Sequence, residues 1–295
     1  MATLESLQKR IKTTADLRDI VSTMKSLSSV SILQYDQAVL SLKGYRKNIK
    51  DGFHALLKCR PMISQPEPKK GRTLVILIGS DNGLVGRFNK EALQASQQFL
   101  KAEGADDALF LTVGKRMAVL AENAKVDLLA KYAISNSIKF VNSLAGTVIV
   151  RLYEAMQARK VNKVVVFYHK REQGTSVTLE KMTLLPFSKS VFADLKKKKW
   201  DTNNVPLVTL PTPVLTQALI KEYLMIELCT ALTYSLSAEH HTRMVNMQNA
   251  EKNIDETLHL LNQEYQQKRQ DAITEELIDV VSGSEAINSD KRKKK

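Results

Sequence analysis

Apolar residues near the amino end of the chain recur at helical spacing. Residues 1–43 contain neither glycine nor proline. Steps of three, four or their sums separate the apolar positions, which are Leu4, Leu7, Ile11, Leu17, Val21, Met24 and Leu27. Such steps place side chains on one face of a helix. Three prolines then fall within residues 59–72. We therefore predict a helix over 1–58 and a linker over 59–72.

The middle of the chain has a different pattern. Short apolar runs rich in β-branched residues occupy 73–78, 108–113 and 163–169, and a more amphipathic run follows at 175–187. Continuously apolar runs suit parallel strands that are buried on both faces. Helix-like segments at 88–103, 115–123 and 138–159 separate them. This alternation predicts βαβ units, hence a Rossmann-like α/β domain over 73–190 and a linker over 191–212.

The carboxyl end returns to helical spacing. Residues 214–282 lack glycine and proline, and their apolar stripe has a mean step close to the coiled-coil period. The stripe comprises Ile226, Cys229, Leu232, Leu236, His240, Met244, Met247, Ala250, Ile254, Leu258, Leu261, Tyr265, Lys268 and Ala272. A helix over 213–282 is too long for the middle domain to cover. We therefore expect the N- and C-terminal helices to form a long antiparallel coiled coil that the α/β domain interrupts. Residues 283–295 are expected to be a disordered basic tail.

The stripe is also poorly suited to a free-standing coiled coil. It contains the polar residues His240 and Lys268 and the small residues Ala250 and Ala272. A self-sufficient coiled coil prefers leucine, isoleucine or valine at such positions. This composition suggests that the helices are held within an outer sleeve.

The charge of the chain leaves one alternative class open. The formal net charge is +13, and part of the excess lies in lysine-rich runs at 196–199 and 291–295. These runs are typical of a solvated loop and tail, although they could also attract nucleic acid or a lipid surface. No aromatic stacking motif accompanies them. No apolar run is long enough to cross a bilayer, so we expect no membrane insertion.

A glycine-rich loop, "GSDNGLVGRFN" at 79–89, follows the first predicted strand. It lacks the G-x-x-x-x-G-K-[ST] spacing of a phosphate-binding loop, and Asp81 would repel a phosphate. We expect Ser80 or Asp81 to bond local amides, while glycines such as Gly83 and Gly86 permit a tight turn.

Residues for catalysis or metal binding are not found in a recognisable arrangement. His240 and His241 are adjacent on a helix and point about 100° apart, so they cannot share a metal ion. Cys59 and Cys229 form no C-x-x-C pair and are expected to be ordinary thiols in a reducing compartment. We therefore expect no catalytic residues, no metal and no cofactor.

Four stretches in register resemble the gamma subunit, the central rotor shaft, of F-type ATP synthases. The opening "TLESLQKRIKTTADLRDIVSTMKSLSSV" resembles that family's first helix, with its Met-Lys pair at Met24 and Lys25. The loop "SDNGLVG" is similar to S-D-[RK]-G-L-C-G, with Asn82 and Val85 as departures. The stretches at 242–253 and 267–287 are similar to A-R-M-x-A-M-x-x-A-x-x-N and R-Q-x-x-I-T-x-E-L-x-E-I-x-x-G-A.

This resemblance implies a non-catalytic subunit that couples rotation to conformational change at nucleotide sites on beta subunits. The implied partners are a hexameric ring of alpha and beta subunits, an epsilon- or delta-type subunit and the membrane rotor ring. The residues implied to contact beta are Met24, Lys25, Arg243, Arg269, Gln270, Thr274 and Glu276. Ser80, Asp81, Gly83 and Gly86 would shape a loop of the foot domain. The implied location is peripheral to an energy-transducing membrane, on the cytoplasmic face in a bacterium or the matrix face in a mitochondrion.

Three alternatives remain beside this interpretation. A nucleic-acid or membrane-surface binding protein would explain the net charge and would show salt-sensitive DNA binding. A nucleotide-dependent enzyme would require stoichiometric nucleotide binding by the isolated chain. A simple coiled-coil tether would leave the motif at 267–287 unexplained.

Overall fold

The computed structural model describes residues 3–59, 71–105, 107–135, 137–172, 176–186, 200, 204 and 206–293, with side chains up to residue 282. The chain divides into two compact units. The sheet unit is Leu27–Asn246, and the terminal-helix unit combines Met1–Ser26 with Met247–Lys295. Helices α1, Leu4–Cys59, and α6, Thr212–Lys293, each contribute to both units. The lysine run at 196–199 lies outside the described residues, as do most of both predicted linkers.

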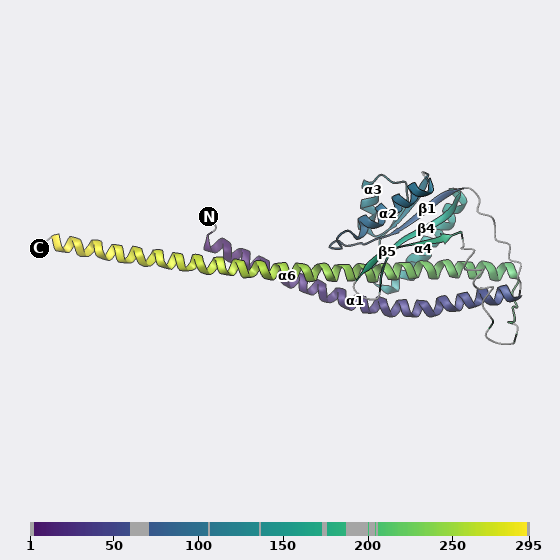
Figure 1. Ribbon diagram of the computed structural model, residues 1–295, viewed down its shortest axis with the longest axis horizontal. Coiled ribbons are helices and arrows are strands. Elements are labelled where there is room, and N and C mark those ends of the chain that lie inside the picture. The colour runs from purple at the N-terminus through teal and green to yellow at the C-terminus, as the bar shows by residue number, and fades with distance from the viewer. Residues whose placement is uncertain are drawn as a thin grey trace. The chain divides into compact units, whose positions relative to one another are not determined.

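The sheet unit contains five strands in the order β3-β2-β1-β4-β5 (Figure 1). The strands are β1 Arg72–Ile78, β2 Ala108–Val113, β3 Leu128–Tyr132, β4 Val161–Arg171 and β5 Val177–Leu185. The first four are parallel, and β5 runs antiparallel to β4. In the central register, Val75 lies between Phe110 and Val165. This mostly parallel sheet confirms the predicted α/β fold class.

Helices cover both faces of the sheet. Helices α2, Phe88–Glu103, and α3, Lys115–Asn123, pack on one face. The short 3-10 helix η1, Ile138–Phe140, leads into α4, Val141–Ala158, which packs with α6 on the other face. The sheet therefore separates two hydrophobic cores, and the connections after β1 and β3 leave it on opposite faces.

Strand β3 was not predicted from the sequence. Its five residues, LLAKY, are only half-buried or exposed. A short strand at the edge of a sheet carries neither a long apolar run nor a clear alternation.

Helix α6 is enclosed on more than one side within the sheet unit. Every side chain from Leu224 to Arg243 is buried or half-buried. Leu228 and Leu232 join the core beneath the sheet, and the hydroxyl of Ser235 donates to the carbonyl of Ile78 at 3.5 Å. Helix α1 packs on another face of α6. The sheet therefore buries one stretch of this long helix, and α1 contributes to the burial of the same stretch.

Helices α1 and α6 run antiparallel in both units. In the sheet unit, Arg46 donates two hydrogen bonds, of 2.6 and 2.8 Å, to the carboxylate of Glu227. In the terminal-helix unit, Arg18 pairs with Asp255 at 2.6 Å, and Lys25 pairs with Glu251. These cross-helix pairs confirm the predicted antiparallel arrangement, because the residue number in α6 falls as the residue number of its partner in α1 rises.

The predicted contact face of α1 was only partly right. Leu7 is fully buried, but Leu17 is 50% exposed and Leu27 is 64% exposed. In the sheet unit, the buried residues of α1 begin with the row Ser28, Ile32, Tyr35 and Val39. Ser28 is buried because it lies four residues before Ile32 and seven before Tyr35, on the same helix face. The larger apolar residue Leu27 is one position out of this row and is therefore exposed.

The end of α6 also differs from expectation. The helix continues to Lys293 and does not stop at 282. Because a single glycine costs a helix only about 1 kcal/mol, Gly283 is a weak stop signal. The final two residues, 294 and 295, lie outside the described part of the chain.

Candidate functional site

The foot loop, residues 79–89, connects β1 to α2 and is held by its own side chains. The backbone N–H of Ser80 donates to Oδ1 of Asn89 at 2.9 Å, and Nδ2 of Asn89 donates to the Ser80 hydroxyl at 2.9 Å. The same hydroxyl donates to the carbonyl of Asn82 at 2.8 Å. Ser80 is fully buried. Its hydroxyl is therefore engaged in shaping the turn.

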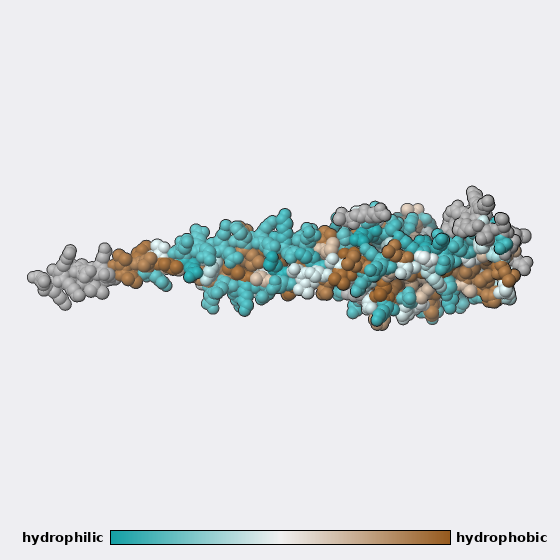
Figure 2. Space-filling model, turned by 90° about the horizontal axis from the view of Figure 1, so that it is seen from below, coloured by the Kyte–Doolittle hydropathy of each residue, from teal (hydrophilic) through white to brown (hydrophobic). Residues whose placement is uncertain are grey.

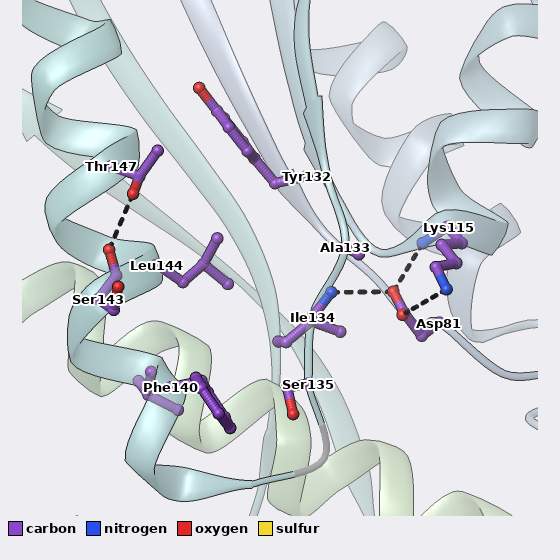
Figure 3. A pocket seen from close by; sticks show the side chains of 11 residues that line it. Asp81, Lys115, Tyr132, Ala133, Ile134, Ser135, Phe140, Ser143, Leu144 and Thr147 are labelled. Carbon is purple, nitrogen blue, oxygen red and sulfur yellow. Dashed lines mark hydrogen bonds and ion pairs between the residues drawn. The ribbon is translucent and has the colours of Figure 1, made fainter.

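Asp81 joins three segments of the sheet unit (Figure 3). Its Oδ1 accepts the backbone N–H groups of Lys115 and Ile134, each at 2.9 Å. Its Oδ2 lies 3.9 Å from Nζ of Lys115. The carboxylate thus occupies the amino end of α3, where a helix favours negative charge. The expected bond from Asp81 to amides is present, but these amides belong to distant segments rather than to the loop itself.

Two of the glycines around the foot loop are required by space or backbone angle. A Cβ on Gly79 would lie 2.4 Å from Oδ1 of Asn89 and 2.6 Å from Cβ of Met117. Gly86 has a φ of +58°, which side-chain-bearing residues rarely adopt. Gly83 has open space, since its nearest neighbour would be Arg116 at 3.8 Å. The tight turn therefore depends on Gly79 and Gly86 more than on Gly83.

Helix α6 packs at the carboxyl ends of β1 and β4, where open α/β sheets usually bind ligands. Val85 and Phe88 pack against Ala238 of α6. Nδ2 of Asn246 donates to the carbonyl of Leu84 at 2.9 Å. The ring of Phe88 also stacks on His169 of β4 with centroids 3.7 Å apart. These contacts pack the foot loop and α2 against α6 and β4 at this end of the sheet.

A set of buried titratable groups lies where α6 meets the sheet. Burial raises the pKa of Glu239 to about 7, although the ion pair with Arg243 acts in the opposite direction. Burial lowers the pKa of His169 to about 4. Burial, with a smaller contribution from Arg243, also lowers the pKa of His240 to about 4. The ring of His240 stacks on Tyr35 of α1. Both imidazoles are therefore neutral at physiological pH.

Metal and thiol chemistry find no support in the described part of the chain. No group of three or more His, Cys, Asp or Glu side chains there could hold a metal ion. Cys229 is buried, and burial raises the pKa of its thiol to about 11. Cys59 is half-buried and donates to the carbonyl of Pro206 at 2.9 Å. Both are free thiols, as expected from the sequence.

The residues implied to contact beta are found in different environments. Met24 is half-buried in the terminal-helix unit, and Lys25 beside it pairs with Glu251 of α6. Arg243 lies in the sheet unit, only 4% exposed, with its guanidinium on Glu239. Its charge therefore acts inside the chain and is not presented on an open face.

The remaining four candidate residues lie together near the carboxyl end of α6. Arg269, Gln270, Thr274 and Glu276 are all exposed. The hydroxyl of Thr274 donates to the carbonyl of Gln270 within the helix, at 2.8 Å. At 100° per residue, Arg269, Gln270 and Glu276 share one side of the helix. This side is available to another molecule.

An exposed apolar tip continues from these residues. It consists of Ile273, Leu277, Ile278, Val280 and Val281, each between 48 and 71% exposed. In Figure 1, α6 extends beyond the amino end of α1 within the terminal-helix unit. Figure 2 shows the tip as a brown band next to the grey end of the chain. The clustering of these apolar residues in "ITEELIDVV" is visible in the sequence and predicts such a tip.

None of the helices among the described residues has the length and apolar character needed to cross a membrane.

Comparisons with known proteins cover nearly the whole chain. A family model described as ATP synthase matches residues 3–287. The ATP synthase gamma chain of Geotalea uraniireducens is 28% identical, over 97% of this chain and 99% of the relative. That of Prosthecochloris aestuarii is also 28% identical, over the same shares.

Solved structures show a similar fold. A chain in the Euglena gracilis mitochondrial ATP synthase (OSCP/F1/c-ring) aligns with a TM-score of 0.62 at 15% identity, over 98% of this chain and 95% of that one. A chain in the central stalk/c-ring of the Tetrahymena thermophila mitochondrial ATP synthase aligns with a TM-score of 0.55 at 18% identity, over 78% and 99%. At these identities the likeness concerns the fold alone.

Proposed function

Because this chain belongs to the ATP synthase family, we propose that it is the gamma subunit, the non-catalytic central shaft of a rotary ATP synthase. The observation that carries the proposal is end-to-end similarity to gamma chains, over 97% of this chain and 99% of the relative. The exposed apolar tip of α6 and the absence of a phosphate-binding motif in the foot loop support a role in binding proteins rather than nucleotides. In this proposal, nucleotide chemistry takes place on other subunits.

We assign the shaft to the long terminal helices and the foot to the α/β domain between them. Residues 1–58 and 213–282 form the shaft, and 73–190 form a foot domain, with 59–72 and 191–212 joining them. The shaft would pass through a ring of three alpha and three beta subunits. The foot would meet an epsilon- or delta-type subunit and the membrane rotor ring. The chain would thus be peripheral to an energy-transducing membrane without entering it.

Coupling requires that different beta conformations meet different faces of the shaft. A shaft that bound every beta state equally would shift none of them. Arg269 and Gln270 lie on one side of α6, while Asp271 and Glu275 lie on the other. The helix is therefore chemically asymmetric at this level. Its apolar tip offers contact without directional bonds, which suits a shaft that turns within its partner.

We propose that Arg269, Gln270, Thr274 and Glu276 contact beta directly. Met24 and Lys25 would contribute from α1, where the ion pair of Lys25 with Glu251 lowers the pKa of that carboxyl group. Arg243 would support this contact from within the chain. Electrostatic attraction between the basic residues of α1, such as Lys25, and acidic parts of beta would speed assembly.

The test is native mass spectrometry of the tagged chain purified from its own cells, with ATPase activity measured on the same sample. We expect one copy with three alpha-like and three beta-like chains. The double variant Arg269→Ala/Gln270→Ala should lower ATPase activity by at least tenfold. Asp271→Ala/Glu275→Ala is the matched control, because both residues are exposed on the same helix and face the other way. A chain isolated alone or with nucleic acid would refute the proposal.

A further inference from the structure

A cavity of about 450 Å³ opens beside β3 in the foot domain (Figure 3). One wall is formed by the end of β3 and the chain after it, with Tyr132 and Ile134. The opposite wall is the first part of α4, with Leu144 and Thr147. Asp81 and Lys115 lie at its margin. The lining is more apolar than polar, and Asp81, Lys115, Ser135, Ser143 and Thr147 contribute its polar side chains.

Strand β3 forms one edge of the sheet, since β2 is the only strand paired with it among the described residues. The carbonyl of Tyr132 accepts the N–H of Gly114 at 2.8 Å, and the N–H of Ile134 is bound by Asp81. Because strand residues alternate in direction, the backbone groups of Lys131 and Ala133 face away from β2. Such an edge is a template for a further strand.

The accessible part of this edge is its carboxyl half. At the amino half, Nη2 of Arg151 donates to the carbonyl of Leu129 at 3.4 Å, so α4 already covers that acceptor. Lys131 and Ala133 are exposed. Ala133 lines the cavity and Lys131 lies two residues before it, so one added segment could pair with the edge and also reach the space beside α4.

The charges around this edge are mostly positive. Lys115 is exposed, and the Asp81 carboxylate near it is already bonded to two backbone N–H groups. Among the described residues, Lys139 and Arg116 take part in no ion pair, and Lys131 pairs with Glu122. Phe140 adds an apolar rim and is 58% exposed. An acidic segment with apolar side chains is the occupant that fits.

We propose that the carboxyl half of β3 binds an extended, acidic segment of a different polypeptide, which adds a strand to the sheet. One apolar side chain of that segment would enter the cavity between β3 and α4. Backbone hydrogen bonds would give affinity, and the cavity with its basic rim would give specificity. This inference rests on the proposed function, because it assigns one partner surface to the foot domain.

The first experiment locates the occupant by cross-linking. Phe140 is 58% exposed at the cavity rim and is replaced by p-benzoylphenylalanine, which keeps an aromatic ring at this position, in the chain expressed in its own cells. After irradiation, the purified complex is digested and the cross-linked peptide is sequenced. We expect a peptide of net negative charge from another chain. A peptide from a second copy of this chain, a basic or neutral peptide, or no cross-link would overturn the inference.

The second experiment measures hydrogen exchange of the peptide that covers 127–135, in the isolated chain and in the complex. We expect exchange in this peptide to be at least tenfold slower in the complex. Ser143→Trp, which fills the cavity, should abolish that protection. Gln157→Trp is the control, because it adds the same side chain to an exposed position of α4 that does not line the cavity.

The same samples separate the two proposals. If native mass spectrometry shows the chain with its alpha-like and beta-like partners but the 127–135 peptide exchanges equally in both states, the docking inference alone fails. If no such assembly exists, the proposed function fails, and the docking inference fails with it.

Discussion

Arg243 donates to the carboxylate of Glu239 one turn earlier on α6, and only 5% and 1% of their side-chain surfaces are exposed. Removing one member of a buried pair leaves the other charge without compensation. We expect Arg243→Met to lower the free energy of unfolding by about 3 kcal/mol. Urea unfolding of the full chain measures this change. Arg18→Met is the control, because its pair with Asp255 is half exposed and should contribute about 0–1 kcal/mol. Equal losses in the two variants would contradict the prediction.

Stability at mildly acidic pH should depend on buried groups whose protonation has opposite effects on the free energy of unfolding. His169 and His240 have folded pKa values near 4, below their usual 6.5. The folded state therefore binds fewer protons than the unfolded state, and stability is lost as the pH falls from 6.5 towards 4. Glu239 has a folded pKa near 7, above its usual 4.5, so its contribution rises as the pH falls through the same range. Between pH 7 and pH 5, each group changes the free energy of unfolding by about 2 kcal/mol.

Glu239→Gln should therefore make the chain more sensitive to acid. The variant loses the contribution that grows at low pH, while both histidines still favour the unfolded state there. Urea midpoints at pH 7 and pH 5 measure the effect, and we expect a larger drop for Glu239→Gln than for the unmodified chain. His169→Leu should reduce the drop. Parallel behaviour of all three proteins would show that these groups do not control the pH dependence.

Substitutions of two glycines in the foot loop, Gly79 and Gly83, should have different effects on stability. Gly79→Ala forces a Cβ to within 2.6 Å or less of Asn89 and Met117, both of which are held by packing or hydrogen bonds. We expect a loss of about 3 kcal/mol, at the upper end of the range for overpacked buried sites. Gly83→Ala is the control and should change stability by less than about 1 kcal/mol, because its space is open. Thermal unfolding of the two variants tests this difference.

The apolar tip should be unimportant for folding and important for assembly. Leu277 and Val281 are 60% and 57% exposed, so Leu277→Gln/Val281→Gln should change the free energy of unfolding of the isolated chain by less than about 0.5 kcal/mol. In the purified complex, the same variant should lower ATPase activity or the yield of assembled complex several-fold. A large loss of stability in the isolated chain would show that the tip packs within this chain instead.

The sequence predicted the fold class because its periodicities are long and distinct. Seven strand- or helix-forming segments of the middle domain were located, and α2 was predicted with its observed bounds, 88–103. The missed element, β3, has only five residues and lies at a sheet edge. The burial of His240 follows from its place on the predicted stripe, but that of Glu239 was not predictable, since a single helical stripe cannot reveal that the sheet covers a second face of α6. The partner-contact residues came from motif resemblance and remain predictions.

The enclosure of α6 has a mechanical consequence. Between Leu224 and Arg243, the helix is packed against α1 and against the sheet, so it cannot turn independently of the sheet unit. A torque applied to the foot domain would therefore reach the shaft through some twenty packed side chains. The chain segments at either end of the domain need carry little of that load. The length and composition of these segments can therefore vary between relatives without weakening the transmission of torque from the foot domain to the shaft.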